Sequence, residues 1–233
     1  MKNKFAFIFL FGRLIGNSSL FRNIFSRHFS NEDKLNIGCG SNFVENWINI
    51  SLFRFHRIPY FIYLTKKEKK DVIVIHFDIT KNLPIKPDSI SYVYASHFIE
   101  HLNFEQGLKF VNNCYTIMKK GGTIRLSCPD LGLWIQKYFE KDNDFFYTYY
   151  NLTKDNNKLS ELKTMGEIFM SQLHGWGHKW GYDFESIKDI LERAGFTKVV
   201  KKEVFDSKIP DIKKLEPTGG TRLLETVYVD ATK

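Results

Sequence analysis

The sequence Leu35-Asn36-Ile37-Gly38-Cys39-Gly40 joins a short apolar run to two glycines separated by one residue. We predict a strand over 34–37 and a tight turn at the glycines. A glycine turn directly after a strand lets the backbone approach a ligand closely, because a side chain there would clash. Glycine pairs at this spacing are frequent, so the turn taken alone fits a structural role as well as a binding role.

Downstream of this turn, apolar runs alternate with helical patterns, which is typical of βαβ units and a mostly parallel sheet. Six further strands are predicted at 47–51, 71–77, 89–96, 123–127, 196–205 and 223–231. Helices are predicted at 103–118, which ends at Gly121-Gly122, and at 183–194. The last two strands are close enough in sequence to pair antiparallel. The predicted fold is therefore α/β, a Rossmann-like, doubly wound, seven-stranded and mostly parallel sheet with an antiparallel last strand.

Residues 130–180 differ from the rest of the chain because they are aromatic-rich and irregular. Their tyrosines and phenylalanines include Tyr138, Phe139, Phe145, Phe146, Tyr147, Tyr149 and Tyr150. We predict a helical insert over the strand ends, whose rings form either its own core or a lid over substrate, since aromatic faces stack on sugar rings. The predicted organisation is an N-terminal arm at 1–30 and one domain at 31–233 that carries this insert.

The net charge of +8 is concentrated in the arm. Residues 1–30 contain five basic side chains and no acidic one, so the remaining residues are close to charge balance. This distribution argues against a nucleic-acid partner. The apolar run Phe5–Phe11 is far shorter than the roughly 20 residues that span a bilayer. We expect the arm to pack on the domain as a helix; a basic amphipathic anchor at a membrane surface and a secretion signal are the alternatives.

The three cysteines, Cys39, Cys114 and Cys128, are odd in number and widely spaced. They predict neither a disulfide framework nor a zinc site, and reduced thiols are the usual state in the cytoplasm. We therefore expect a cytoplasmic protein. If the arm is an anchor, the protein makes weak contact with the inner face of the membrane through residues 1–30.

Polar or small residues follow the first four predicted strands at the points where they end. They are Asn36–Ser41, Ser51, Asp78 and Ser96-His97. Ligands of doubly wound sheets bind beyond the carboxyl ends of the strands, near the position where the strand order reverses. We therefore predict a ligand site at this edge, where Asp78 accepts a hydrogen bond from the exocyclic amine of an adenine ring. The alternative role for Asp78 is to cap the turn before Thr80.

Read in order, eight short motifs of the chain resemble those of class I S-adenosylmethionine-dependent methyltransferases. The motifs are LNIGCG (35–40), NWINI (46–50), FDI (77–79), LP (83–84), DSI (88–90), SHFIEHL (96–102), MKKGG (118–122) and AGF (194–196). The resemblance covers residues 34–128 and 174–230, and it is closest to a bacterial group found among sugar and cell-surface biosynthesis enzymes. It implies S-adenosylmethionine as cofactor and methyl transfer to oxygen or nitrogen of a small molecule, a sugar or a cell-surface glycan precursor.

The resemblance also implies which residues hold the cofactor. They are Asn36, Gly38, Cys39, Gly40, Ser51, Asp78, Ile79, Ser96 and His97. In the family pattern the glycine turn lines the methionine end, Asp78 and Ile79 flank the adenine, and Ser96 and His97 close the site.

Ser51 departs from the family pattern, in which the residue that ends the second strand is usually acidic and holds both ribose hydroxyls. A serine lacks the bidentate, charge-assisted hydrogen bonds of a carboxylate. The loss is expected to weaken cofactor binding by about 1–3 kcal/mol. The alternative function is a non-catalytic protein of the same fold, with a degraded cofactor site, that acts as a binding or regulatory partner.

Three histidines are candidates for the base that removes a proton from a hydroxyl or ammonium acceptor. They are His101, which follows Glu100, and the pair His174 and His178. The alternative for His101 is a structural role in its loop. We expect no metal site, because Gly175 and Gly177 disfavour a helix between the histidine pair and no carboxylate stands at the expected spacing.

Two other enzyme classes are disfavoured. An RNA methyltransferase is disfavoured because the basic charge lies in the arm and no Asn-Pro-Pro-Tyr type of motif occurs. A nicotinamide dehydrogenase is disfavoured because Phe43 stands where the third glycine of a GxGxxG pattern would be.

Overall fold

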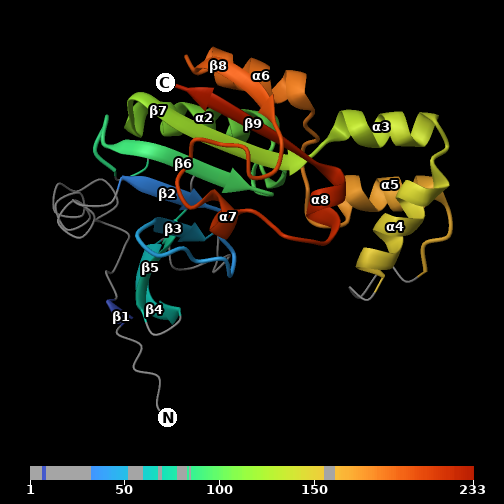
Figure 1. Ribbon diagram of the computed structural model, residues 1–233, viewed down its shortest axis with the longest axis horizontal. Helices are drawn as coiled ribbons and strands as arrows, with labels where there is room; N and C mark the ends of the chain where they lie inside the picture. Colours follow the sequence, from blue (N-terminus) through green and yellow to red (C-terminus); the bar gives the residue numbers. More distant parts are fainter. Residues whose placement is uncertain are drawn as a thin grey trace, which may run out of the picture.

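The computed structural model describes residues 7–8, 33–51, 60–67, 70–77, 83, 85–154 and 161–233; for 7–8, 60–67 and 70–77 only the backbone is described. These residues form one nine-stranded sheet in the order β1-β4-β5-β3-β2-β6-β7-β9-β8 (Figure 1). The strands are β1 (Phe7–Ile8), β2 (Lys34–Ile37), β3 (Ile48–Ser51), β4 (Tyr60–Lys67), β5 (Lys70–Phe77), β6 (Ile90–Ser96), β7 (Met118–Pro129), β8 (Thr197–Lys202) and β9 (Thr226–Thr232).

The centre of the sheet is parallel. β5, β3, β2, β6 and β7 pair in parallel, whereas β9 runs antiparallel to both of its neighbours. The strand order reverses at β2, because β3 lies on one side of it and β6 on the other. The Rossmann-like α/β fold with an antiparallel last strand is thus confirmed, and the carboxyl end of β2 lies at the position where such folds bind ligands.

The predicted strand number was wrong. A strand is present in each of the seven predicted ranges, although the strand at 196–205 ends at Lys202 and residues 223–225 are helical. In addition, β4 pairs antiparallel with β5, and β1 pairs antiparallel with β4. The last residue of β4, Lys67, is paired with the first residue of β5, Lys70. β4 and β1 extend the sheet beyond β5.

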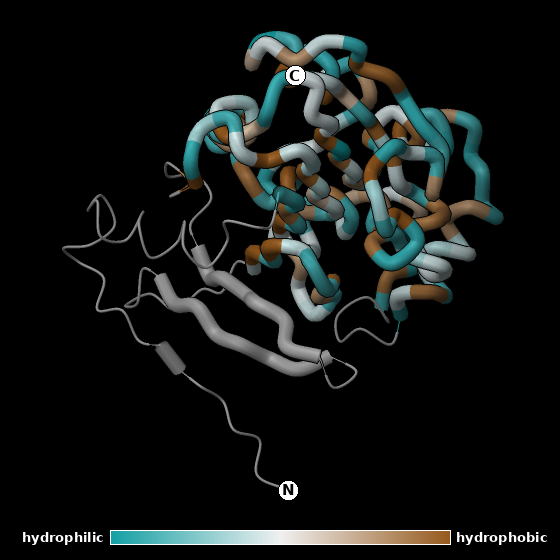
Figure 2. The backbone as a smooth tube through the Cα atoms, turned by 60° about the vertical axis from the view of Figure 1, so that its left-hand side comes forward, coloured by the Kyte–Doolittle hydropathy of each residue, from teal (hydrophilic) through white to brown (hydrophobic). Residues whose placement is uncertain are grey.

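Two capped helices cover one face of the sheet. α2 (Phe104–Ile117) begins at Asn103 and α6 (Phe184–Arg193) begins at Asp183, each in a capping box that satisfies the first free backbone N–H groups. The two helices contact each other, and their apolar faces share one core with β2, β3, β6, β7 and β9. Figure 2 shows hydrophilic residues along much of the periphery of the described chain and apolar residues nearer its centre.

Side chains on β6 alternate between the two faces. Val93 belongs to the core under α2 and α6, whereas Tyr94 packs on the other face with Val44, Trp47 and Leu215. Leu215 ends α7 (Ile212–Leu215), a short helix in the connection between β8 and β9. This connection therefore covers the face that the two long helices leave open.

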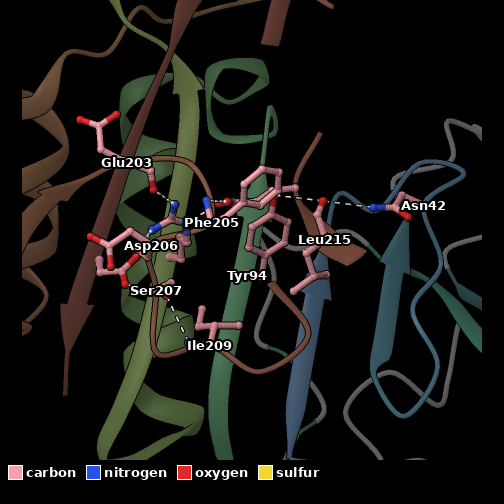
Figure 3. Close-up of polar contacts among 11 residues, drawn as sticks. Asn42, Tyr94, Glu203, Phe205, Asp206, Ser207, Ile209 and Leu215 are labelled. Atoms are coloured by element: carbon pink, nitrogen blue, oxygen red, sulfur yellow. Dashed lines mark hydrogen bonds and ion pairs between the residues drawn. The ribbon is translucent and has the colours of Figure 1, made fainter. Parts of the chain in front are cut away.

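The connection between β8 and β9 is tied to the loop after the glycine turn. The Leu215 carbonyl accepts hydrogen bonds from Tyr94 Oη at 3.3 Å and from Asn42 Nδ2 at 3.1 Å (Figure 3). Residues 206–216 were not assigned in the sequence analysis, and the strand predicted over 196–205 ends earlier, at Lys202. This connection holds the loop at 41–47 in place through the hydrogen bond from Asn42 to the Leu215 carbonyl.

Three helices form a separate layer beyond the carboxyl end of β7 (Figure 1). They are α3 (Leu131–Phe139), α4 (Asn143–Thr153) and α5 (Met165–His174). Trp134 is buried at their centre, with its ring 4.9 Å from that of Phe145 and 4.7 Å from that of Tyr149. A helical, aromatic-rich segment is thus present where one was predicted; its rings are divided between this core and the surface, where Phe139 is 87% exposed.

The N-terminal arm lies outside the described residues except for Phe7–Ile8, which form β1 and not part of the expected helix. Among the residues that the structure describes, no helix is long and apolar enough to cross a membrane. The division into an arm at 1–30 and a domain at 31–233 stays a prediction.

Candidate functional site at the carboxyl ends of β2, β3 and β6

In the turn after β2, glycine is required at the two positions for different structural reasons. Both have a left-handed backbone, with φ of +68° at Gly38 and +52° at Gly40. A Cβ at Gly38 would lie 2.7 Å from Cδ2 of Phe98, whereas a Cβ at Gly40 would meet nothing within 4 Å. Gly38 is thus required by packing against the segment after β6, and Gly40 borders open space that a ligand can enter.

Buried amides hold the loop that follows the turn. Asn36 Nδ2 donates to the Asn42 carbonyl and to Asn49 Oδ1, both at 3.0 Å. The Asn49 side chain exchanges hydrogen bonds with both backbone groups of Val44 and donates to the Trp47 carbonyl. Both protons of the Asn36 amide are therefore used inside the protein, and the role of Asn49 was missed by the sequence analysis.

The turn is also fixed to β3. The backbone N–H of Cys39 donates to the Ile50 carbonyl at 3.1 Å. Burial raises the pKa of the Cys39 thiol to about 12, so it stays protonated and is no nucleophile. Ser51 ends β3, is 7% exposed, and is paired with His76 of β5. Asp78 and Ile79, the predicted adenine contacts, lie outside the described residues.

The segment after β6 brings His97 into the interior. Its backbone is left-handed, with φ of +48°, a conformation that costs a non-glycine residue about 1–2 kcal/mol. Its Nε2 lies 2.8 Å from Thr226 Oγ1, at the start of β9. Burial, assisted by the charge of Arg222, lowers the pKa of His97 to about 3, so the ring is neutral at neutral pH. Strain of this kind is often found at functional sites.

Two of the three candidate base histidines lie together. The rings of His101, in the 3₁₀ helix η1 (Ile99–His101), and His178 have centroids 5.0 Å apart. Glu100 lies beside them and is 2% exposed, and burial raises the pKa of its carboxyl to about 8. His174 ends α5, is exposed, and is not part of this cluster. The sequence analysis treated Glu100 only as a partner that orients His101.

A second buried carboxyl ties the helical layer to the strand ends. Glu225, at the end of α8 (Thr221–Glu225), accepts hydrogen bonds from Trp134 Nε1 at 3.2 Å and from Gln172 Nε2. Burial raises the pKa of Glu225 to about 8. Helices α3 and α5 are therefore attached to the segment that leads into β9, beside His97.

Comparison with protein families places this site in a known class of domain. Residues 35–126 match the family model for a methyltransferase domain. The match contains the glycine turn, Ser51 and the 96–102 segment. The resemblance to class I methyltransferases is thus confirmed over these residues; the bacterial sugar and cell-surface subgroup stays a prediction. No curated protein matches the sequence.

Several solved structures are similar to the chain. An S-adenosylmethionine-dependent methyltransferase from Archaeoglobus fulgidus is 16% identical, with a TM-score of 0.46, over 92% of this chain and 93% of that one. For a possible histamine N-methyltransferase from Thermotoga maritima the identity is 16%, the TM-score 0.46, and the coverage 92% and 88%. A third similar structure is phosphoethanolamine N-methyltransferase 2 from Haemonchus contortus, solved with phosphomonomethylethanolamine and S-adenosylhomocysteine. It is 13% identical, with a TM-score of 0.46, over 94% of this chain and 53% of that one. Identities this low carry no substrate over to this chain.

Proposed function

We propose that this protein is an S-adenosylmethionine-dependent methyltransferase that acts on oxygen or nitrogen of a small molecule, with a sugar or cell-surface glycan precursor as the acceptor. The observation that carries the proposal is the glycine turn at the carboxyl end of β2. It lies where the strand order reverses, borders open space at Gly40, and belongs to the segment that matches a methyltransferase domain.

The residues around the turn fit the cofactor. When bound, S-adenosylmethionine supplies an activated methyl group on a sulfonium. We assign its contacts to the backbone at Gly38–Gly40, the Ser51 hydroxyl and the segment at Ser96-His97, together with Asp78 and Ile79 on the strength of the sequence. Asn36 would act through the loop that its amide holds.

The chain's own contribution to transfer is to position the acceptor and accept its proton. We propose His101 and His178 ahead of His174 for the second task, because they lie together beside Glu100. Burial lowers the pKa of His178 to about 4, so its ring is neutral at neutral pH but is a weak base. The exposed surface of the helical layer is proposed to face the acceptor.

The first test is calorimetric titration of the full chain with S-adenosylhomocysteine. We expect one weak site per chain, because Ser51 lacks the two charge-assisted hydrogen bonds of a carboxylate. Absence of heat at millimolar ligand contradicts the proposal. Binding without methyl transfer to any of a panel of nucleotide sugars would favour the non-catalytic alternative, for which Ser51 is the supporting observation.

Ser51→Asp is expected to strengthen S-adenosylhomocysteine binding by roughly 5- to 150-fold, from about 1–3 kcal/mol of added hydrogen bonding. The same variant should melt at a lower temperature without ligand, because a carboxylate replaces a hydroxyl at a site that is 7% exposed. Ser51→Asn has the same shape without the charge and serves as the control. Equal affinities for the two variants would show that the ribose does not lie at the end of β3.

We also propose that the protein acts in the cytoplasm, and that residues 1–30 make weak contact with the inner face of the membrane. The supporting observation is the cluster of basic residues beside an apolar run.

A further inference from the structure

Glu100, His101 and His178 meet at one point of the interior. Each offers a side-chain atom able to bind a metal ion, and the three atoms all lie within 4.8 Å of one another. Glu100 and His101 come from η1, and His178 from the turn after α5. The two segments are joined by the backbone, since the N–H groups of Lys179 and Trp180 donate to the Glu100 carbonyl at 2.7 and 3.2 Å. The cluster is thus held by the fold.

The Glu100 carboxylate is buried without a hydrogen-bond donor. Neither of its oxygens has a hydrogen-bond partner among the described residues. The nearest ring nitrogens are His97 Nδ1 at 3.6 Å and His178 Nε2 at 4.0 Å, too far to donate a hydrogen bond. Buried carboxylates are normally paired with a cation or bound to a metal, because an isolated charge in the interior is strongly destabilising. Burial favours the protonated form of Glu100 when no cation is present, and both of its oxygens still lack a hydrogen-bond partner among the described residues. A bound cation would satisfy them and favour the carboxylate.

The two histidines present the nitrogens that a metal needs. His178 Nδ1 lies 2.6 Å from the Gln172 carbonyl, and His101 Nδ1 lies 3.3 Å from the Gly177 carbonyl. A carbonyl oxygen only accepts, so Nδ1 carries the proton in both rings and Nε2 carries the lone pair. Metal-binding histidines usually hold their second nitrogen in this way, which fixes the ring and its tautomer.

The spacing suits an ion between the side chains. Two ligands that are each about 2.0–2.1 Å from a tetrahedral zinc ion lie roughly 3.4 Å apart. His178 Nε2 and Glu100 Oε1 are 4.0 Å apart, longer than a hydrogen bond and close to that value. The three donor atoms lie within 4.8 Å of one another, a wider spacing than in a tetrahedral site, so the side chains would move toward the ion on binding.

We propose that Glu100, His101 and His178 bind a divalent transition-metal ion, with zinc as the best match. Two imidazole nitrogens and one carboxylate oxygen form a donor set that zinc binds, and three protein ligands leave a position for an oxygen of water or substrate. The sequence analysis expected no metal site because it sought a carboxylate near His174 and His178. The carboxylate comes from η1 instead, and His174 has no part in the site.

A nitrogen lone pair that binds a metal ion does not accept a proton. The base role proposed above for His101 and His178 therefore applies to the metal-free chain. Zinc binding requires no S-adenosylmethionine, so its failure is distinguishable from failure of the proposed function.

The test is equilibrium dialysis of the untagged full chain against ZnCl₂, with metal content measured by mass spectrometry. We expect one zinc ion per chain for the wild type and for His174→Asn, the matched control from the same segment. Glu100→Gln and His178→Asn should each lose more affinity than the roughly 10- to 100-fold that follows loss of an outer hydrogen-bond partner of a metal ligand. Zinc affinity unchanged in these two variants, or no stoichiometric zinc in the wild type, overturns the proposal.

A second measurement on the wild type does not depend on the folding of a variant. X-ray absorption of the zinc-loaded chain should show nitrogen and oxygen ligands that include two imidazoles. A sulfur ligand, or a shell of water alone, would place the ion elsewhere and overturn the proposal.

Discussion

Arg125→Met is expected to lower the free energy of unfolding by about 3–5 kcal/mol, because it leaves buried carboxylates without their cation. Arg125 has a side-chain exposure of 0% on β7. Its Nε donates to Glu216 Oε1 at 2.5 Å and its Nη1 to Asp230 Oδ1 at 2.8 Å. The guanidinium also donates to the carbonyls of Glu203 and Asp206. Burial raises the pKa of Glu216 even with Arg125 present. Without the arginine, its charge would no longer offset the cost of desolvating the Glu216 carboxylate.

Urea denaturation followed by circular dichroism measures this loss. Arg193→Met is the matched control, since Arg193 pairs with Asp189 at 2.8 Å but its side chain is 55% exposed. Exposed pairs on one helix contribute about 0.3–0.5 kcal/mol. If Arg125→Met were no more destabilising than this control, the buried network would not stabilise the fold.

Loss of Arg125 should also weaken ligand binding at the glycine turn. Arg125 holds the start of the connection between β8 and β9, and the Leu215 carbonyl in that connection binds Asn42 (Figure 3). We expect S-adenosylhomocysteine binding to weaken in Arg125→Met under conditions in which the variant is still folded. Equal S-adenosylhomocysteine affinity in the wild type and in Arg125→Met would show that the connection does not influence the proposed cofactor site.

Gly38→Ala is expected to destabilise the protein by about 2–5 kcal/mol, from a left-handed backbone and an overpacked contact together. The added Cβ would lie 2.7–2.8 Å from atoms of Phe98, which is buried beneath α2 and packs edge-on against Phe110. Phe98 therefore has little room to move aside. Thermal unfolding followed by circular dichroism measures the effect.

Gly40→Ala should separate binding from stability. The new Cβ meets nothing within 4 Å, so only the backbone cost of about 1–2 kcal/mol applies. The methyl group enters the space assigned to the cofactor, and we expect S-adenosylhomocysteine affinity to fall by at least about tenfold, the equivalent of 1.4 kcal/mol.

Gly121→Ala is the control for backbone strain, since Gly121 has φ of +81° and equal open space at the start of β7. It should lose stability as Gly40→Ala does but keep full affinity. Equal affinity of the Gly40 and Gly121 variants would show that the cofactor does not approach this turn.

Local patterns predicted much of the fold. The turn at Gly38–Gly40 and the helix that begins after Asp183 depend on residues a few positions apart, and such signals are legible in one sequence. The expected helix end at Gly121-Gly122 was wrong, because α2 ends at Ile117 and both glycines lie in β7. The β4 strand was missed although Tyr60–Leu64 is rich in aromatic and branched residues, a strand signal that could have been used.

By itself, the sequence determined the parallel α/β architecture, the position of the glycine turn and the class of domain. Only the tertiary structure decided which distant residues meet: Arg125 with Asp230, 105 positions apart, Gly38 with Phe98, and Glu100 with His178. The physical reason is that a strand or helix is specified by the periodicity and end residues of a short segment. A buried charge or metal-binding cluster depends instead on side chains that only the packed sheet and its connections bring together.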